Sequence, residues 1–286
     1  MTAFLVARTH DGGNGICQTS RMIKGITTLY LSLALLAGST GCSETVNFQS
    51  DYEASANGLA AYNTGDYATA LPEFQRLAKQ GNVSAQVMMG EMFEYGRGVQ
   101  QDYLKAEQWY REAATRGHAK AQHNLGDMYS RGEGLDQDDA LAVHWYRKAA
   151  ERGLWASLLN LGDAYSKGKG VPEDAEKGFQ YFKLAAETGA VIAQYRLAFR
   201  YADGAGVERN LVFAHMWWNL ATLSANRGPS LQWGEEVNDI SPAQIAETQR
   251  VSLQLRDVIA RGMTPEQIGE AGNLARDCAR KKFKGC

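Results

Sequence analysis

The sequence predicts an all-α protein, a right-handed α-solenoid of antiparallel helical hairpins with C-terminal capping helices. Aromatic pairs return every 36 residues, at 109–110, 145–146, 181–182 and 217–218, with no insertion or deletion between the copies. Small residues recur with the same step at Gly90, Gly126, Gly162 and Ala198. A fixed period of this length is typical of units that bury their apolar faces only by stacking on one another. We therefore expect function on a surface rather than in a deep pocket.

Each copy is expected to contain two helices joined by a glycine turn. In the first copy, small and apolar residues at helical spacing predict a helix over 85–93. Gly96 and Gly98 then end it, since glycine readily adopts a positive φ. Asp102 is placed to cap a second helix, whose inward face runs from Ala106 to the terminal Gly117. A Gly-x-Gly that follows a helix and lacks a P-loop lysine indicates this turn rather than a phosphate site.

The recurring aromatic and small residues are expected to form the core. Gly90 and Ala106 let the two helix axes approach closely, and Trp109 is predicted to fill the gap beside them. The aromatic pairs keep step with the alanines of the same helix face, which favours core packing over ligand stacking.

The residues of the second copy carry a resemblance to a known family. The matching positions are Ala121-Gln122, Leu125-Gly126, Tyr129, Gly132, Gly134, Trp145-Tyr146, Ala149-Ala150 and Gly153. They resemble the Sel1-like repeat, a relative of the tetratricopeptide repeat with a longer loop, and four such copies span 82–225. Residues 51–81 resemble one ordinary tetratricopeptide hairpin that would cap the N-terminal end. The resemblance implies an adaptor that assembles complexes by binding proteins.

The chain after the fourth copy, 226–286, is expected to form a loop and two capping helices. Gly228-Pro229 and Gly234 indicate the loop. Ser241 and Thr264 are each followed by proline and then by a capping-box glutamine, which predicts two helix starts. Capping helices of this kind cover the apolar end of a solenoid.

Residues 1–42 have the layout of a secretory signal. A basic region precedes a short apolar run, 26–37, and small residues then lead to Cys42. The run is too short for a membrane span, which needs about 20 apolar residues. The stretch ending in Cys42 resembles a bacterial lipobox, and lipidation of Cys42 would make an outer-membrane lipoprotein that faces the periplasm, with 43–50 as a linker. Ser39 stands where that motif has leucine, so ordinary cleavage or a short retained anchor stays open, and Met22 is the better start.

Charge and cysteine content limit the partners and the compartment. A net charge of −2 argues against a nucleic acid partner. Cys278 and Cys286 are left in the mature body, and two cysteines in an oxidising compartment most simply pair. An unbroken helix would hold them about 12 Å apart, beyond disulfide reach of about 7 Å. Pairing therefore requires the last helix to stop near Lys281 and Phe283 to fold back.

No catalytic, metal or cofactor site is expected. The histidines at 118, 123, 144 and 215 occupy unlike repeat positions and show no metal-ligand spacing. There is no Gly-x-Ser-x-Gly motif. Some cysteine-rich members of the resembled family are similar to penicillin-binding or β-lactamase proteins, but no repeat here has a cysteine pair. A peptidoglycan-binding or polysaccharide-binding module is a further alternative, suggested by location and by the basic C-terminal tail.

Candidate partner-binding residues lie on the first helix of each copy, which lines the groove in tetratricopeptide repeats. Positions three before and one after the recurring small residue share one helix face. These are Val87, Glu91, His123, Asp127, Leu159, Asp163, Tyr195 and Phe199. They predict an acidic strip over copies one to three and an aromatic patch in copy four, which would bind a protein or peptide. The alternative is that these positions are merely exposed and free to vary.

Overall fold

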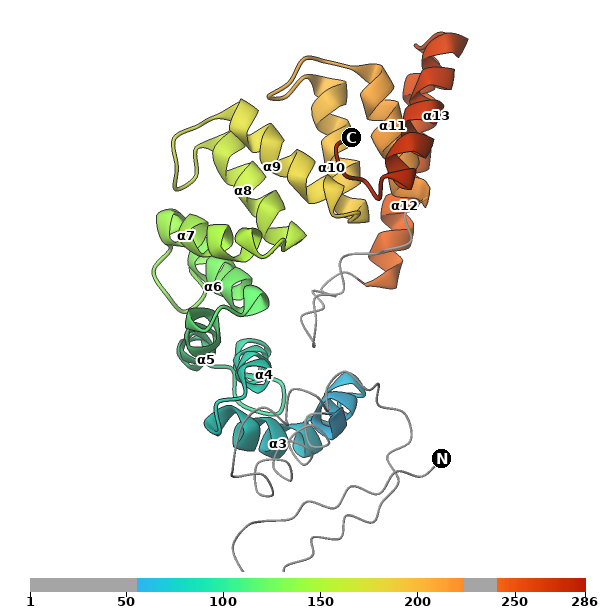
Figure 1. Ribbon diagram of the computed structural model, residues 1–286. Coiled ribbons are helices and arrows are strands. Elements are labelled where there is room, and N and C mark those ends of the chain that lie inside the picture. Colours follow the sequence, from blue (N-terminus) through green and yellow to red (C-terminus); the bar gives the residue numbers. More distant parts are fainter. Residues whose placement is uncertain (1–55, 224–240) are drawn as a thin grey trace, which may run out of the picture. The chain divides into compact units, whose positions relative to one another are not determined.

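The computed structural model describes residues 56–223 and 241–286, and every regular element in these ranges is a helix. A helix over 56–63 comes first. The others are α3 (Tyr67–Lys79), α4 (Val83–Tyr95), α5 (Tyr103–Thr115), α6 (Ala119–Arg131), α7 (Asp139–Glu151), α8 (Trp155–Lys167), α9 (Ala175–Glu187), α10 (Val191–Asp203), α11 (Leu211–Leu223), α12 (Pro242–Ala260) and α13 (Pro265–Arg280). Consecutive helices from α3 to α11 pack against each other in antiparallel pairs (Figure 1). The predicted all-α solenoid is confirmed.

The helix ends repeat as faithfully as the sequence does. The first helices α4, α6, α8 and α10 all end at a glycine in the left-handed conformation, with φ between 65° and 75°. The second helices α5, α7 and α9 all begin after an aspartate whose side chain accepts a hydrogen bond from a backbone N–H of the first turn. The first three copies therefore end the first helix and begin the second helix by the same two devices, which keeps these hairpins the same length.

The close approach within a hairpin uses a different aromatic residue from the one expected. A Cβ atom on Gly90 would lie 2.4 Å from Cε1 of Tyr110, so glycine leaves the space that this ring occupies. Tyr110 is fully buried. Trp109 is only partly buried and packs on the neighbouring cluster formed by α3 and α4. The prediction that Trp109 fills the gap beside Gly90 is wrong, because that residue is turned toward the preceding hairpin.

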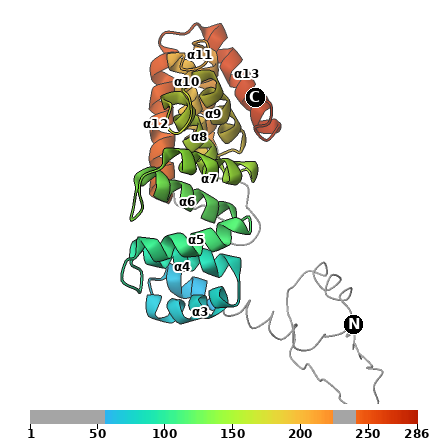
Figure 2. The same cartoon turned by 90° about the vertical axis from the view of Figure 1, so that its left-hand side faces the viewer.

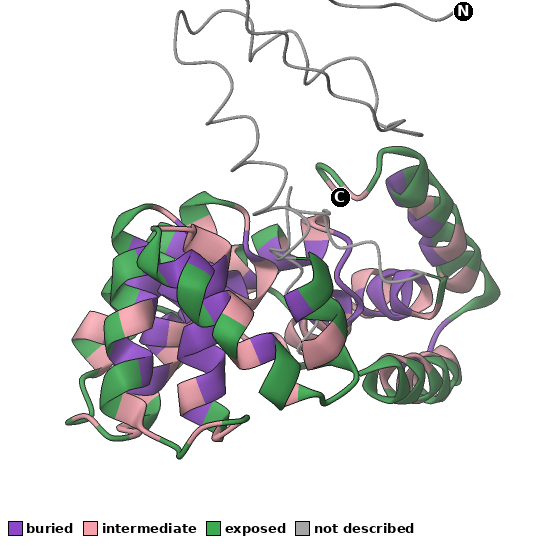
Figure 3. Ribbon diagram, turned by 90° about the horizontal axis from the view of Figure 1, so that it is seen from below, coloured by how far each residue is buried: buried purple, intermediate pink, exposed green. Residues whose placement is uncertain are grey.

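The core runs through the stack as a series of apolar clusters. One cluster joins copies one and two, another joins copies three and four and the C-terminal helix, and a third covers the N-terminal hairpin. Neighbouring helices lie side by side along the stack in Figure 2, as their contacts also show. Buried and exposed residues alternate around the helices in Figure 3, so each helix keeps one face for the core and one for solvent.

The last two helices close the C-terminal end of the stack. Ser241 and Thr264 each cap a helix through a complete capping box, as the sequence predicts. Both α12 and α13 pack on α11, and α12 also reaches α10. Such packing covers the end of copy four, where no further hairpin follows.

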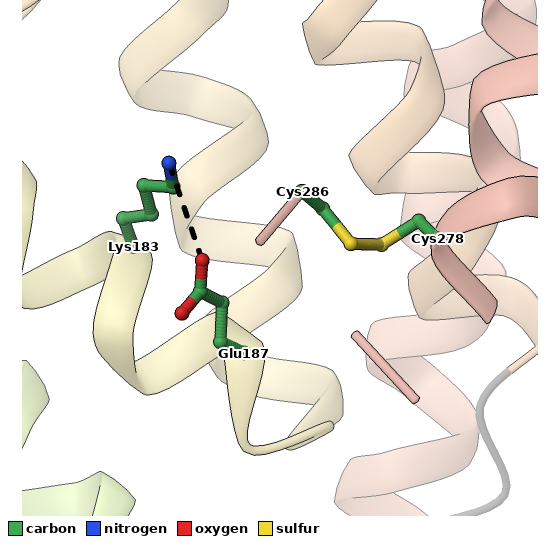
Figure 4. Close-up of a disulfide and its surroundings, with 4 residues drawn as sticks. All are labelled: Lys183, Glu187, Cys278 and Cys286. Atoms are coloured by element: carbon green, nitrogen blue, oxygen red, sulfur yellow. Dashed lines mark ion pairs between the residues drawn. A yellow bond between two sulfur atoms is a disulfide. The ribbon is translucent and has the colours of Figure 1, made fainter. Parts of the chain in front are cut away.

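The C-terminal tail is tied back by a disulfide. The helix α13 ends at Arg280, and Phe283 donates its backbone N–H to the carbonyl of Cys278 at 2.9 Å. Cys278 and Cys286 are bonded, with a Cα–Cα distance of 5.5 Å (Figure 4). Both Phe283 and Cys286 pack on the cluster of copies three and four. The same figure shows Lys183 and Glu187 of α9, whose charged atoms are 4.0 Å apart.

Several sequence predictions fall outside the described residues. These are the leader 1–42 with Cys42, the linker 43–50, the start of the hairpin at 51–55 and the loop up to residue 240. Within the described ranges, none of the helices combines the length and the apolar character that crossing a bilayer requires.

Candidate functional site

The first helices α4, α6, α8 and α10 together form a surface that we call the first-helix face. The positions three before the small residue contribute little to it. Val87, His123 and Leu159 have exposed fractions of 3%, 6% and 4%, and the first and last belong to the apolar clusters between hairpins. Only Tyr195 of this row is partly exposed. These positions mainly pack neighbouring copies together, which leaves a partner little to contact.

The carboxylate of Glu91, the acid of copy one, is already bonded to other residues of the protein. Glu91 is 7% exposed, forms an ion pair with Lys120 at 2.6 Å and accepts a hydrogen bond from the hydroxyl of Tyr62 at 3.2 Å. Lys120 comes from the next copy and Tyr62 from the N-terminal hairpin. The carboxylate therefore ties three hairpins together, and its burial needs both partners.

The acids of copies two and three are more open but also bridge copies. Asp127 accepts hydrogen bonds from the hydroxyl of Tyr146 at 2.7 Å and from Nδ2 of Asn160 at 3.0 Å. Asp163 pairs with Arg196 at 2.7 Å and with Arg200 at 3.5 Å. Asn160 and Arg196 both belong to the first helix of the following copy. The acidic residues of the predicted strip therefore form contacts between neighbouring copies. The sequence analysis missed this role, although Asn160 and Arg196 also stand 36 residues apart.

The aromatic residues of copy four form a continuous stack of edge contacts. The rings of Tyr195 and Phe199 meet edge to face with centroids 5.0 Å apart, and Phe199 meets Trp218 at 5.1 Å. Tyr195 and Phe199 are partly exposed, whereas Trp218 is buried. The patch therefore presents two partly exposed rings, and the buried indole of Trp218 packs against one of them, Phe199.

A cleft opens on the first-helix face where copies two and three meet. Its volume is about 300 Å³, and α6, α7 and α8 supply most of its lining. The lining residues are Asp127, Ser130, Arg131, Asp139, Ala142, Val143, Tyr146, Asn160, Asp163, Ala164, Lys167 and Lys169. Charges of both signs, one amide and two hydroxyl groups surround a small apolar area. Such a surface suits a peptide segment, whose backbone and side chains offer matching donors, acceptors and charges.

Tyr146 is a fixed hydrogen-bond donor at the edge of this cleft. Burial raises its pKa above the usual range, and the charge of Asp127 adds to the effect. The phenol therefore keeps its proton and holds Asp127 in place. In copy one, burial also raises the pKa of Glu94, which accepts a hydrogen bond from Tyr110 at 2.7 Å.

A serine, a histidine and an aspartate meet beneath the first-helix face without forming a usable catalytic site. Nδ1 of His123 lies 2.8 Å from Oγ of Ser157, and its Nε2 lies 3.8 Å from Asp127. Ser157 is completely buried, so a substrate has no access to its hydroxyl. In the described part of the chain, no group of three metal-ligating side chains comes together either.

Comparison with known proteins identifies the family to which the four repeats belong. A family model described as the Sel1 repeat matches residues 83–118, 119–154, 155–189 and 191–226. A Sel1 repeat protein from Oxalobacter formigenes is 31% identical, with a TM-score of 0.54, over 59% of this chain and 70% of that one.

A second solved structure shares the fold over more of the chain. The protein c5321 is a protective antigen present in uropathogenic Escherichia coli strains that displays an SLR fold, and it is 29% identical with a TM-score of 0.58. The match covers 79% of this chain and 47% of c5321, about half the length of that protein. No curated protein matches the chain.

Proposed function

Because the chain belongs to the Sel1 repeat family, we propose that it is an exported, lipid-anchored scaffold without enzymatic activity, which binds a protein or peptide partner on the first-helix face. Sel1 repeats are typically protein-interaction modules, and stacked hairpins offer long surfaces rather than an enclosed pocket. The partner engages the cleft between copies two and three and the aromatic patch of copy four.

The cleft is the observation that carries this proposal. Two of its acids are already bonded, Asp127 to the amide of Asn160 and Asp163 to the guanidinium of Arg196, and these contacts hold the cleft in one shape before a partner arrives. Lys167 and Lys169 are exposed at its edge, and Lys167 is only loosely paired, 3.9 Å from Asp163. These two exposed ammonium groups can reorient when a partner binds, and they favour a partner segment with acidic side chains.

Export and lipid anchoring are supported by the two ends of the chain. The small-residue stretch before Cys42 resembles a lipobox, although Cys42 lies outside the described residues. The disulfide between Cys278 and Cys286 suits an oxidising compartment such as the periplasm. Intact mass of the membrane-bound protein tests the anchor: a mature chain that begins with an acylated Cys42 is expected, and an N-terminus elsewhere contradicts it.

Site-specific photocrosslinking tests the binding surface. A photoreactive residue at Lys169 is expected to capture a defined partner in intact cells, and the same residue at the exposed Lys79 of α3 serves as the control position. The captured protein is then purified and its affinity measured. Changing Lys167 and Lys169 to glutamate is expected to weaken binding at least tenfold, whereas the same change at Lys79 and Lys281 leaves it unaltered. Identical capture from both positions, or equal affinity of both variants, would refute the cleft as the site.

A further inference from the structure

A tyrosine–arginine contact between a first helix and a second helix occurs twice, 36 residues apart, with different charged partners. The tyrosine comes from the end of a first helix and meets an arginine from the second helix of the preceding copy. Tyr129 of copy two meets Arg111 of copy one, and Tyr165 of copy three meets Arg147 of copy two. The two sites allow a direct comparison within one molecule.

In the first of these sites an internal carboxylate satisfies both donors. The hydroxyl of Tyr129 donates to Oε1 of Glu107 at 3.1 Å, and Nε of Arg111 donates to the same oxygen at 2.7 Å. A second guanidinium nitrogen of Arg111 donates to the Tyr129 hydroxyl at 2.6 Å. The three groups form a closed set in which one negative charge balances one positive charge.

In the second site the carboxylate is missing and a further cation is added. Val143 occupies the position of Glu107, and Lys177 takes the place of Leu141. Arg147 donates to the hydroxyl of Tyr165 at 2.7 Å, and Nζ of Lys177 lies 4.3 Å from the centre of the same ring. Among the described residues, no carboxylate lies within 4.0 Å of the charged nitrogens of Arg147 or Lys177. Two positive charges and a phenolic proton therefore converge without an anion.

The site is held in place and open to solvent at the same time. Tyr165 is 5% exposed, and its ring stacks on that of Tyr181 with centroids 5.4 Å apart and 12° between the planes. The side chains of Arg147 and Lys177 are exposed. An anion arriving from solvent can thus reach the cations, while the phenol that would orient it does not have to be ordered on binding.

We propose that Tyr165, Arg147 and Lys177 form a binding site for a carboxylate group from an acidic segment of a partner protein. The guanidinium matches a carboxylate in two-pronged geometry, the phenol donates its proton, and the ammonium adds charge. Copy two shows the same tyrosine and arginine satisfied by Glu107. None of Tyr165, Arg147 and Lys177 lines the cleft of the first-helix face, so the proposal does not depend on that cleft.

The probe for this site is a hexaglutamate peptide, followed by NMR of the full chain labelled with ¹³C at Cζ of tyrosine. Titration at about 10 mM ionic strength, where electrostatic attraction is weakly screened, is expected to shift the Tyr165 signal in a saturable way. The double variant Arg147→Ala, Lys177→Ala is expected to weaken binding at least tenfold. The matched control Arg111→Ala is expected to leave the affinity unchanged, because that guanidinium already belongs to an internal pair.

A second variant recreates the internal carboxylate. Val143→Glu copies the arrangement of Glu107 and Arg111 onto α7, beside Arg147, and is expected to abolish the shift of Tyr165 by the peptide. Circular dichroism establishes that this variant is folded, and if it is not, the double variant alone decides. The proposal is overturned if wild-type protein gives no saturable shift at millimolar peptide, or if the double variant binds as well. A response to inorganic phosphate but not to the peptide or to acetate also overturns it.

Discussion

Replacing Gly126 with alanine is expected to destabilise the protein, because the new Cβ atom would lie 2.5 Å from Cε1 of Tyr146. An ordinary contact begins at 3.4 Å, so the ring would have to retreat by the difference of 0.9 Å. Tyr146 is 5% exposed and its hydroxyl is bonded to Asp127, which leaves it no simple direction of movement. The ring can move only by breaking that hydrogen bond or by displacing α7.

The magnitude follows from three contributions. Overpacking in a well-packed core costs about 1–3 kcal/mol, and a lost hydrogen bond to a charged group costs about 1.5–3 kcal/mol. Replacing glycine by alanine inside a helix returns about 1 kcal/mol. The expected loss in unfolding free energy for Gly126→Ala is therefore about 1.5–5 kcal/mol, combining these values.

Gly162→Ala is the matched comparison. Its Cβ atom would lie 2.9 Å from the ring of Phe182, which has no hydroxyl to hold it, so the expected loss is only about 0–2 kcal/mol. Urea unfolding followed by circular dichroism gives the ranking, and hydrogen exchange of α6 and α7 shows whether the loss is local. Equal stability of Gly126→Ala and wild type, or a larger effect at Gly162, would refute the reasoning.

Two further predictions concern the acid response and the C-terminal tail. Burial, with the charge of Lys120, lowers the pKa of His118 to about 4. The unfolded-state pKa is about 6.5, so protonation favours unfolding, and stability is lost as the pH falls from 6.5 toward 4, by about 2–3 kcal/mol. His118→Asn, which keeps the side-chain cap of the equivalent Asn82, is expected to remove this part of the pH dependence in urea titrations; an unchanged profile would contradict it. The double variant Cys278→Ser, Cys286→Ser is expected to lower the unfolding free energy of the C-terminal end by about 2–3 kcal/mol, because the loop is no longer closed. Tryptic cleavage of the tail is expected to become faster. Unchanged cleavage would show that the disulfide does not restrain the tail.

The fold could be predicted from the sequence because its determinants are local and repeated. Gly96 and Asp102 end and begin helices through their own backbone or side chain, and the structure has them in those roles. The capping boxes at Ser241 and Thr264 are equally local. The assignment of Trp109 to the hairpin gap failed because neighbouring positions 109 and 110 are both aromatic, and their side chains point to different hairpins.

The candidate site was harder to predict, because exposure depends on neighbours that a helix pattern does not show. Glu91 and Asp127 occupy equivalent positions, yet Glu91 is buried against Lys120 whereas Asp127 lies at the edge of the cleft. Val87 is covered by the adjoining copy. Ser130 lines the cleft although it is not among the candidate residues of the sequence analysis. Partner contact by any of these residues stays a prediction.

The ties between first helices have a consequence for how the chain could change in length. Asp127 meets Asn160 and Asp163 meets Arg196, each 33 residues onward. If residues 119–154 were duplicated in tandem, Asp127 would face the duplicate of Asn124, which offers the same amide as Asn160. The new boundary would then keep the contact between an aspartate and an amide. The interior of the protein thus tolerates growth by whole copies, whereas α12 and α13, fitted to α10 and α11, require the last copy to stay last.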